Sequence, residues 1–445
     1  MIVGLTVSRA RSSAKAGAAA ASPTTPAAFP LRTVAGKRYL DDAAGKPFLI
    51  HGEAAWSLIA QLTREKVDLY LKDRQARGFN TVLVSLIEHM FCTNPPANAY
   101  GEQPFLTAGD YSSPNERYFA HADWVLQRAA EKGFLVLLVP SYLGSGGGPE
   151  GWYQEMVANG AARLHRYGQY LGRRYRDFAN ILWVHGADYN PPSKALVRAI
   201  ADGIREFDPT ALHSAQCAPE TAALDYWRGE SWLNVNSIYT YRPVYSAALT
   251  QYAHSEHLPF FLIESAYENE HGVTEQRLRA QAYQAVLSGA AGQIFGNNPI
   301  WHFDGPGIYP VSMTWQQAMG SRGTQSMTHL RSLLSMVPWW LLEPESGDRL
   351  LTGGLGSGYD RAVVACSTDR SLAIAYLPSL RKITFDLKRL TGPRIRARWY
   401  DPADGKFSDV RDSPFPAMGL QSFAQDLGRN SAGFEDWVLI LESRS

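Results

Sequence analysis

Eight short apolar runs alternate with longer amphipathic segments along the first three quarters of this 445-residue chain, and this alternation constrains the fold most. The runs are apolar at nearly every position, as strands are when helices cover both faces of a sheet. Eight such strand and helix units in succession predict an α/β fold of the (β/α)₈ barrel type. The expected strands lie at 48–53, 81–90, 134–142, 181–190, 211–217, 232–240, 260–269 and 292–301.

The segments between these runs carry helical spacing, which predicts helices over 63–79 and 115–134. Gly133 is well placed to end the second helix. Ahead of the barrel, apolar residues at 39–40 and 47–50 flank a turn-forming segment and predict a β-hairpin. The residues that share one face of the first helix are Val67, Tyr70, Leu71 and Arg74.

The pattern changes beyond about residue 346, where short strands are separated by Gly, Pro and Asp turns and no helical period is present. This pattern predicts an antiparallel β-sandwich of about 100 residues. We therefore expect the catalytic barrel with its hairpin over 31–342 and the β-sandwich domain over 343–445. The strands expected in the sandwich lie at 362–367, 371–378, 383–387, 395–401 and 436–442.

Residues 1–30 are rich in alanine and proline, and this composition indicates a disordered leader or a degenerate export segment. The apolar start, MIVGLTV, is too short for the core of a signal peptide, and its basic residues come after it rather than before it. If residues 1–30 are an export segment, a periplasmic or secreted location is favoured over a cytoplasmic one. No stretch reaches the ~18 apolar residues of a membrane span, so we expect no membrane partner.

Composition excludes several classes of partner. The formal net charge is +1 with both signs interspersed, which gives no footprint for nucleic acid. Cys92, Cys217 and Cys366 lie far apart and show no metal-ligand spacing, so we expect no metal, no disulfide framework and no cofactor. The 12 Trp and 22 Tyr suit a carbohydrate-binding surface, and an oligo- or polysaccharide bound by a monomer is the expected complex.

Polar side chains follow every one of the eight expected strands. Because the carboxyl ends of all barrel strands meet at one rim, we expect these side chains to converge on one cleft. They are His51 and Glu53, Glu88 and His89, Ser141 and Tyr142, His185 and Asp188, His213 and Gln216, Asn236 and Tyr239, Glu264 and Tyr267, and Asn297 and Trp301.

Asp188 and Glu264 stand out because each ends an otherwise apolar strand, the fourth and the seventh. Two carboxylates across a barrel mouth suit glycoside hydrolysis, in which one protonates the leaving oxygen and the other attacks the anomeric carbon or activates water. A helix cap or a salt bridge is the alternative for either residue. Glu268 and Glu270 lie beyond the apolar run and are expected on a solvated loop.

Other rim residues are candidates for holding substrate. Bidentate carboxylates and imidazoles suit sugar hydroxyls and aromatic rings suit sugar faces, but structural hydrogen bonds and core packing remain open for the same residues. His185, His213 and Asn236 are expected to orient the carboxylates. The substrate-binding candidates are Glu53, Trp56, Glu88, His89, His185, Tyr189, Asn236, Tyr239, Tyr267 and Trp301.

Three separated segments resemble a known family in the same order. HGEAAWSLIAQLTREKVDLYLKDRQARGFNTVLV, YLGRRYRDFANILWVHGADYNPP and PFFLIESAYENE resemble the apiosidase-like glycoside hydrolases, family 140, over residues 37–340. The trailing module, with RWYDPADGKF, is similar to the collagen-binding-type β-sandwich found in these proteins.

The resemblance implies a retaining, exo-acting enzyme that removes apiose from plant pectin side chains. It assigns the acid/base to Asp188 in GADYN and the nucleophile to Glu264 in LIESAYE. Two positions depart from the family pattern: Glu53 stands where an aspartate is usual, and Ala187 where a glycine is usual. Because a longer carboxylate could hold a different hydroxyl, the Glu53 departure leaves the identity of the sugar open.

Two alternatives remain at this point. The chain could be a non-catalytic carbohydrate- or matrix-binding protein, since a fold does not guarantee an activity. It could also be an endo-acting glycosidase on another glycan, which needs an open cleft. The loops at 91–114, 143–151 and 302–314 would decide between a cleft and a pocket.

Overall fold

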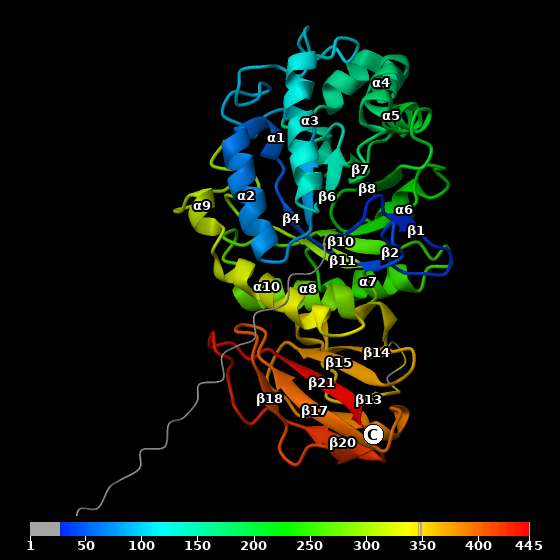
Figure 1. Ribbon diagram of the computed structural model, residues 1–445, viewed down its shortest axis with the longest axis vertical. Helices are drawn as coiled ribbons and strands as arrows, with labels where there is room; N and C mark the ends of the chain where they lie inside the picture. Colours follow the sequence, from blue (N-terminus) through cyan, green and yellow to red (C-terminus); the bar gives the residue numbers. More distant parts are fainter. Residues whose placement is uncertain (1–26, 346, 348, 445) are drawn as a thin grey trace, which may run out of the picture.

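The computed structural model describes residues 27–345, 347 and 349–444, and Figure 1 shows a barrel that stands on a smaller β domain. Eight parallel strands form one sheet in the order β8-β7-β6-β5-β4-β11-β10-β9. Each expected strand is present, so the predicted (β/α)₈ barrel is confirmed. The strands are β4 (Ile50–Ala54), β5 (Thr81–Ser85), β6 (Leu135–Val139), β7 (Ile181–Gly186), β8 (Leu212–Gln216), β9 (Asn236–Tyr239), β10 (Phe260–Glu264) and β11 (Gly292–Phe295).

The first and last strands of this order, β8 and β9, meet and close the barrel. The backbone nitrogen of Val235, just before β9, donates to the carbonyl of His213 on β8 at 3.0 Å. The hydroxyl of Ser237 donates to the carbonyl of Ala215 at 2.5 Å. These contacts bring the two ends of the sheet together into a nearly closed barrel, and all eight carboxyl ends point to one rim.

Helices surround the barrel, and the strands alternate between two apolar layers. Leu182 and Val184 of β7 fill the barrel interior, whereas Ile181 and Trp183 of the same strand pack outward against the helices. This alternation decides which polar side chains face the rim. The helices are α1 (Leu58–Gln61), α2 (Arg64–Ala76), α3 (Glu116–Glu131), α4 (Tyr153–Tyr175), α5 (Ala195–Arg205), α6 (Ala223–Trp227), α7 (Val244–Tyr252), α8 (Glu275–Leu287), α9 (Trp315–Ala318) and α10 (Arg322–Ser335).

The predicted features ahead of and within the barrel hold. Leu40 of β2 (Leu40–Asp41) pairs with Phe48 of β3 (Pro47–Phe48), which confirms the hairpin, and β1 (Arg32–Thr33) adds a third strand that the sequence did not indicate. Gly133, with φ +77°, follows the end of α3 as expected. The first 26 residues of the expected leader lie outside the described residues.

The C-terminal domain is an antiparallel β-sandwich, as predicted. Its larger sheet runs β12-β14-β15-β21-β17-β18, with β19 paired to β17, and its smaller sheet runs β13-β16-β20. The strands are β12 (Leu342–Pro344), β13 (Leu351–Gly353), β14 (Val363–Ser367), β15 (Leu372–Leu377), β16 (Ile383–Asp386), β17 (Arg394–Tyr400), β18 (Phe407–Asp409), β19 (Phe415–Pro416), β20 (Leu420–Phe423) and β21 (Trp437–Arg444).

Helices α8 and α10 lie between the barrel and the sandwich (Figure 1), and a buried ion pair joins the two domains. Arg279 on α8 donates to both carboxylate oxygens of Asp436 at 2.7 Å. The Tyr376 hydroxyl donates to Asp436 at 3.0 Å, and its ring stacks on Tyr283 with 4.9 Å between centroids. Since both charges are paired and desolvated, this contact fixes the sandwich against the helix.

Two further observations concern the described part of the chain. None of its helices has both the length and the apolar character that a membrane crossing requires. It also contains no group of three His, Cys, Asp or Glu side chains arranged to hold a metal ion.

Candidate active site

A cavity of about 310 Å³ opens at the rim formed by the carboxyl ends of the barrel strands. Aromatic rings and carboxylates make up most of its wall, which is a composition that suits sugars. The lining residues are Trp56, Ser85, Glu88, Phe91, Tyr142, Ser145, Glu150, Asp188, Pro219, Tyr239, Tyr241, Glu264, Tyr267, Glu270, Trp301, Ile308 and Tyr309.

Asp188 reaches this cavity through an unusual backbone conformation. Gly186, Ala187 and Asp188 have φ values of +86°, +82° and +58°, and Ala187 is fully buried. Three successive left-handed residues turn the chain sharply at the end of β7, and only the glycine adopts that conformation without strain. The strained turn directs the carboxylate into the cavity, where Tyr142 donates to it at 2.8 Å.

Glu264 faces the cavity because of a bulge in β10. Phe260 and Leu262 pack outward, so simple alternation would place Glu264 outward as well. The pairing with β9 shifts register between Leu262 and Glu264, and this irregularity turns the carboxylate inward. Its side chain is buried and lines the cavity with Asp188.

Gln216 at the end of β8 joins the two carboxylates. Its Nε2 donates to Glu264 Oε2 at 2.7 Å and to Asp188 Oδ1 at 3.2 Å. Two oxygens that accept hydrogen bonds from one nitrogen can be no farther apart than the sum of the two N–O distances, about 6 Å. Inverting glycosidases separate their carboxylates by roughly 6.5–9.5 Å. Asp188 and Glu264 therefore lie close to each other.

This proximity changes how the pair titrates. Burial raises the pKa of Asp188 to about 6, although hydrogen bonds from Tyr142 and Tyr239 act to lower this pKa. Burial also raises the pKa of Glu264 well above its ordinary value, and the charge of Asp188 raises it further. The pair consequently keeps one proton at pH values where two isolated carboxyl groups would both be ionised.

Five of the ten predicted binding residues line the cavity, and side-chain hydrogen bonds hold four of them in place. Trp56 Nε1 donates to the Tyr267 hydroxyl at 3.1 Å, and Trp301 Nε1 donates to Glu270 at 3.1 Å. The Tyr239 hydroxyl lies 2.8 Å from the hydroxyl of Tyr241. The five are Trp56, Glu88, Tyr239, Tyr267 and Trp301.

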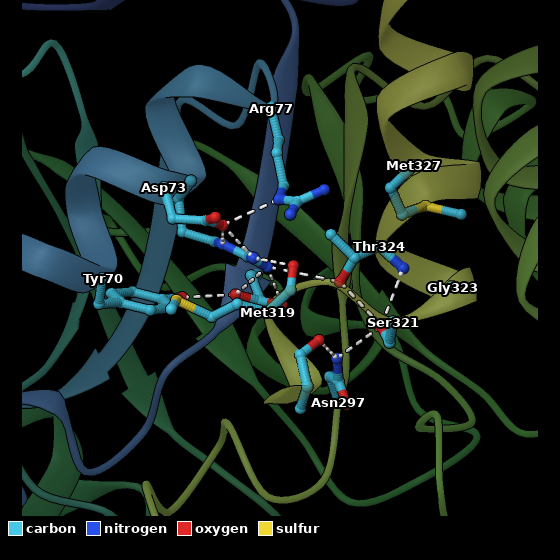
Figure 2. A network of polar contacts seen from close by, with 12 residues as sticks. Tyr70, Asp73, Arg77, Asn297, Met319, Ser321, Gly323, Thr324 and Met327 are labelled. Carbon is cyan, nitrogen blue, oxygen red and sulfur yellow. Dashed lines mark hydrogen bonds and ion pairs between the residues drawn. The ribbon is translucent and has the colours of Figure 1, made fainter. Parts of the chain in front are cut away.

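Glu53 lies outside the cavity and bonds to Tyr70, which is labelled in the polar network of Figure 2, so its predicted role as a substrate ligand is not supported. Arg74 donates to its Oε1 at 2.9 Å and Tyr70 to its Oε2 at 2.7 Å. The physical reason is strand alternation: Ile50 and Ala54 of β4 face the barrel interior, which turns Glu53 toward α2. The Glu53 departure therefore bears on packing rather than on the sugar.

The alternation of side chains along the strands also places His185 and Asn236 outside the cavity. His185 Nε2 lies 2.8 Å from His213 Nδ1 behind the strands, and burial lowers the pKa of His185 to about 3. Asn236 accepts from the backbone of Leu224 at 2.9 Å and donates to Gln251 at 3.0 Å. Neither residue contacts the two carboxylates, so the expected orienting role falls to Gln216 instead.

His89 and Tyr189 lie near the rim but do not line the cavity. His89 Nε2 lies 3.1 Å from Glu155, and its ring packs edge-on against Trp152. Tyr189 packs its ring against Tyr153 with 5.1 Å between centroids. Both stabilise the loops around the site.

The expectation that Glu268 is solvated was wrong, whereas Glu270 is half-buried at the cavity. Glu268 is buried and accepts from the Ser321 hydroxyl at 2.6 Å and from the backbone nitrogen of Gly323 at 2.8 Å, both at the start of α10 (Figure 2). Glu270 lines the cavity, and burial raises its pKa to about 7. Reading the segment after β10 as a rim loop, rather than as plain surface, would have retained Glu270.

Residues 34–341 match the family model described as the apiosidase-like catalytic domain. The chain belongs to the apiosidase-like family. In this apiosidase-like chain, residues 348–442 match the model described as "Putative collagen-binding domain of a collagenase". No curated protein matches it.

Solved glycoside hydrolases share the fold of this apiosidase-like chain. A glycoside hydrolase family 5 protein from Bacteroides vulgatus aligns with TM-score 0.81 and 24% identity, over 94% of each chain. A second glycoside hydrolase aligns with TM-score 0.81 and 24% identity, over 93% of this chain and 97% of its own. A mannosidase from Rhizomucor miehei aligns with TM-score 0.51 and 13% identity, over 70% of this chain and 99% of its own. These likenesses concern the fold, including the sandwich in the first two.

Proposed function

We propose that this protein is a retaining, exo-acting glycoside hydrolase that removes apiose from the side chains of plant pectin. Asp188 is the general acid/base and Glu264 is the nucleophile. Family membership and the wall of aromatic rings and carboxylates support the reaction class. The roles of the two carboxylates and the sugar come from the sequence motifs.

The observation that carries the retaining mechanism is the shared hydrogen-bond donor. Gln216 holds an oxygen of each carboxylate within 3.2 Å of one nitrogen. A retaining enzyme needs a carboxylate separation of ~5–5.5 Å, and an inverting enzyme needs room for a water between the carboxylates. The bridge by Gln216 supports the shorter separation.

The reaction then proceeds in two displacements. Asp188 donates its proton to the glycosidic oxygen while an oxygen of Glu264 bonds to the anomeric carbon, and the bond to the leaving group breaks. In the second step Asp188 takes a proton from water, the water oxygen bonds to the anomeric carbon, and Glu264 leaves as a carboxylate. The first step requires that the single proton held by the pair lie on Asp188 when the substrate is bound.

The shape of the cavity supports exo action. Residues from all three loops that the sequence left open contribute to the same wall: Phe91, Ser145 with Glu150, and Ile308 with Tyr309. A site lined by all three loops is consistent with a pocket that takes the terminal sugar of a side chain. An endo-acting enzyme needs a cleft open at both ends.

The test is to incubate apiose-containing pectin with the wild type and with Glu264→Gln and to identify released sugars by mass spectrometry. Glu275→Gln on α8 makes the same chemical change outside the cavity and serves as the control. We expect free apiose from the wild type and the control, and at least a 10³-fold lower rate from Glu264→Gln. Equal release by Glu264→Gln would overturn the assignment of the nucleophile, and release of a different sugar would overturn the substrate.

A further inference from the structure

One loop of the β-sandwich contacts the barrel beside the candidate active site. The loop follows β13, spans residues 354–361 and has the sequence GLGSGYDR. At Gly356 the backbone φ is +70°, and a Cβ there would lie 2.6 Å from the carbonyl oxygen of Asp360, so the turn requires glycine. The side chain of Arg381 pairs with Asp360 and holds the loop from the sandwich side.

Tyr359 in this loop donates its hydroxyl to a backbone carbonyl of the barrel. The acceptor is the carbonyl oxygen of Tyr241, at 3.0 Å, and Arg277 of α8 donates to the same oxygen at 2.6 Å. The Arg277 guanidinium also lies over the Tyr359 ring, 4.0 Å from its centroid. Arg361 of the same loop lies over the ring of Tyr245 on α7, at 5.2 Å. A hydrogen bond and two cation–π contacts therefore attach the loop to the segment that carries Tyr241.

Tyr241 follows β9 and lines the cavity together with Asp188 and Glu264. Its hydroxyl lies 2.8 Å from the hydroxyl of Tyr239. Burial raises the pKa of both carboxylates, and hydrogen bonds from Tyr239 act to lower it. The backbone nitrogen of Tyr241 donates to Glu220 at 2.9 Å. The backbone of Tyr241 is therefore held at its nitrogen by the barrel, and at its carbonyl by α8 and the sandwich together.

We infer that Tyr359 of the β-sandwich is a positioning residue of the active site, which acts on the catalytic carboxylates through Tyr241 and Tyr239. This inference rests on the proposed roles of Asp188 and Glu264. Because a tyrosine hydroxyl lies at the far end of a long, rigid side chain, a small rotation of the Tyr241 backbone moves it out of hydrogen-bond distance from Tyr239. The sandwich thus supports the cavity wall in addition to packing against the barrel.

A second tyrosine of the sandwich provides a matched control. Tyr400 on β17 donates its hydroxyl to the carbonyl of His329 on α10, at 2.7 Å. His329 lies outside the set of described residues that line the cavity. Tyr359→Phe and Tyr400→Phe each remove one hydroxyl that donates from the sandwich to a barrel carbonyl, but the second carbonyl does not belong to the cavity wall.

The first measurement is NMR of protein labelled with ¹³C at the tyrosine Cζ, in which Tyr239→Phe and Tyr241→Phe assign the two signals. It needs no substrate, so it tests the inference independently of the sugar that the enzyme releases. We expect Tyr359→Phe to shift the signals of Tyr239 and Tyr241 and Tyr400→Phe to shift neither, with thermal melts verifying that all variants are folded. Unchanged signals in Tyr359→Phe would overturn the inference.

The second measurement is the kinetics of sugar release from apiose-containing pectin. The kcat of Tyr359→Phe should fall about fivefold with KM nearly unchanged, because the contact orients reacting groups and does not bind substrate. The alkaline limb of kcat/KM should move to higher pH, because weaker hydrogen bonds from Tyr239 no longer favour the ionised carboxylates. Glu150 and Glu270, whose charges also act on the pair, are retained in every variant.

A double-mutant cycle tests whether Tyr359 acts through Tyr241. On the Tyr241→Phe background, Tyr359→Phe should cause no further loss of kcat, because the hydroxyl that it positions is already absent. Fully additive losses, or equal losses in Tyr359→Phe and Tyr400→Phe, would overturn the inference. If the wild type releases no apiose, the proposed substrate fails while the NMR shifts still decide the role of Tyr359, so the two failures are distinguishable.

Discussion

The side-chain nitrogen of Gln216 lies 2.7 Å from Oε2 of Glu264, and this hydrogen bond gives the nucleophile candidate its orientation. The same nitrogen reaches Asp188 at 3.2 Å, so one amide group sets the separation of both carboxylates. Gln216 comes from β8, between the strands that carry the two carboxylates in the sequence.

Replacing Gln216 by methionine should therefore reduce kcat by about 10²-fold, the usual effect of losing one oriented donor at a reacting group. Methionine preserves the length of the side chain, so folding should be retained. Steady-state kinetics with the released sugar as readout measures the effect. A loss of less than twofold would show that the bridge does not orient the pair.

The pair should also set the pH dependence of kcat/KM. The active form carries one proton, so activity falls at low pH when both groups are protonated and at high pH when both are ionised. Because the pKa of Asp188 is raised to about 6 and that of Glu264 is raised as well, the alkaline limb should lie above pH 6 rather than near 4. A pH profile that falls already between pH 4 and 5 on its alkaline side contradicts this.

Ala187 should tolerate glycine but not valine. Its φ of +82° costs about 1–2 kcal/mol for a residue with a Cβ, while losing the buried methyl group and adding chain freedom costs a similar amount. The two effects offset, so Ala187→Gly should change the free energy of unfolding by less than about 1 kcal/mol. Ala187→Val should lose more than about 2 kcal/mol because a β-branched residue suits this conformation least.

Denaturant unfolding of both Ala187 variants decides the point. A loss of about 2 kcal/mol in the glycine variant would mean that the turn at Asp188 stores no strain, since that is the loss expected from the methyl group and the chain freedom alone.

Glu53→Gln should destabilise the protein without altering substrate binding. The substitution leaves Arg74 buried with one carboxylate partner fewer, which typically costs about 3 kcal/mol. Glu65→Gln, which makes the same change at an exposed position in the first turn of α2, should leave the melting temperature nearly unchanged. An unchanged melting temperature together with a raised KM would return Glu53 to the role of a sugar ligand.

The sequence predicted the eight strands and the sandwich because continuous apolar runs and turn residues are local signals. It placed Glu53, His185 and Asn236 at the rim, but which face of a strand each residue takes depends on register. Counting by twos from Ile50 or Leu182 would have turned Glu53 and His185 outward. The same count fails for Glu264, because the bulge in β10 arises from pairing with β9 and leaves no mark in the local sequence.

Glu270 illustrates a second limit. Its sequence neighbours are polar, as on any surface loop, and its place in the cavity depends on Trp301 and on the Glu268 anchor, which are contacts over long sequence separations. Ala187 was visible as a departure from the family motif, but the left-handed backbone that gives this departure its meaning needed the structure.

The most direct test of the account is to trap the covalent intermediate. Asp188→Ala should still form the glycosyl-enzyme from an aryl apioside, whose leaving group needs no acid, but should hydrolyse it slowly. Peptide mapping by mass spectrometry of the quenched reaction should then find apiose bonded to Glu264. An adduct on another carboxylate such as Glu270, or turnover without any adduct, would contradict the assignment of Glu264 as the nucleophile of a retaining enzyme.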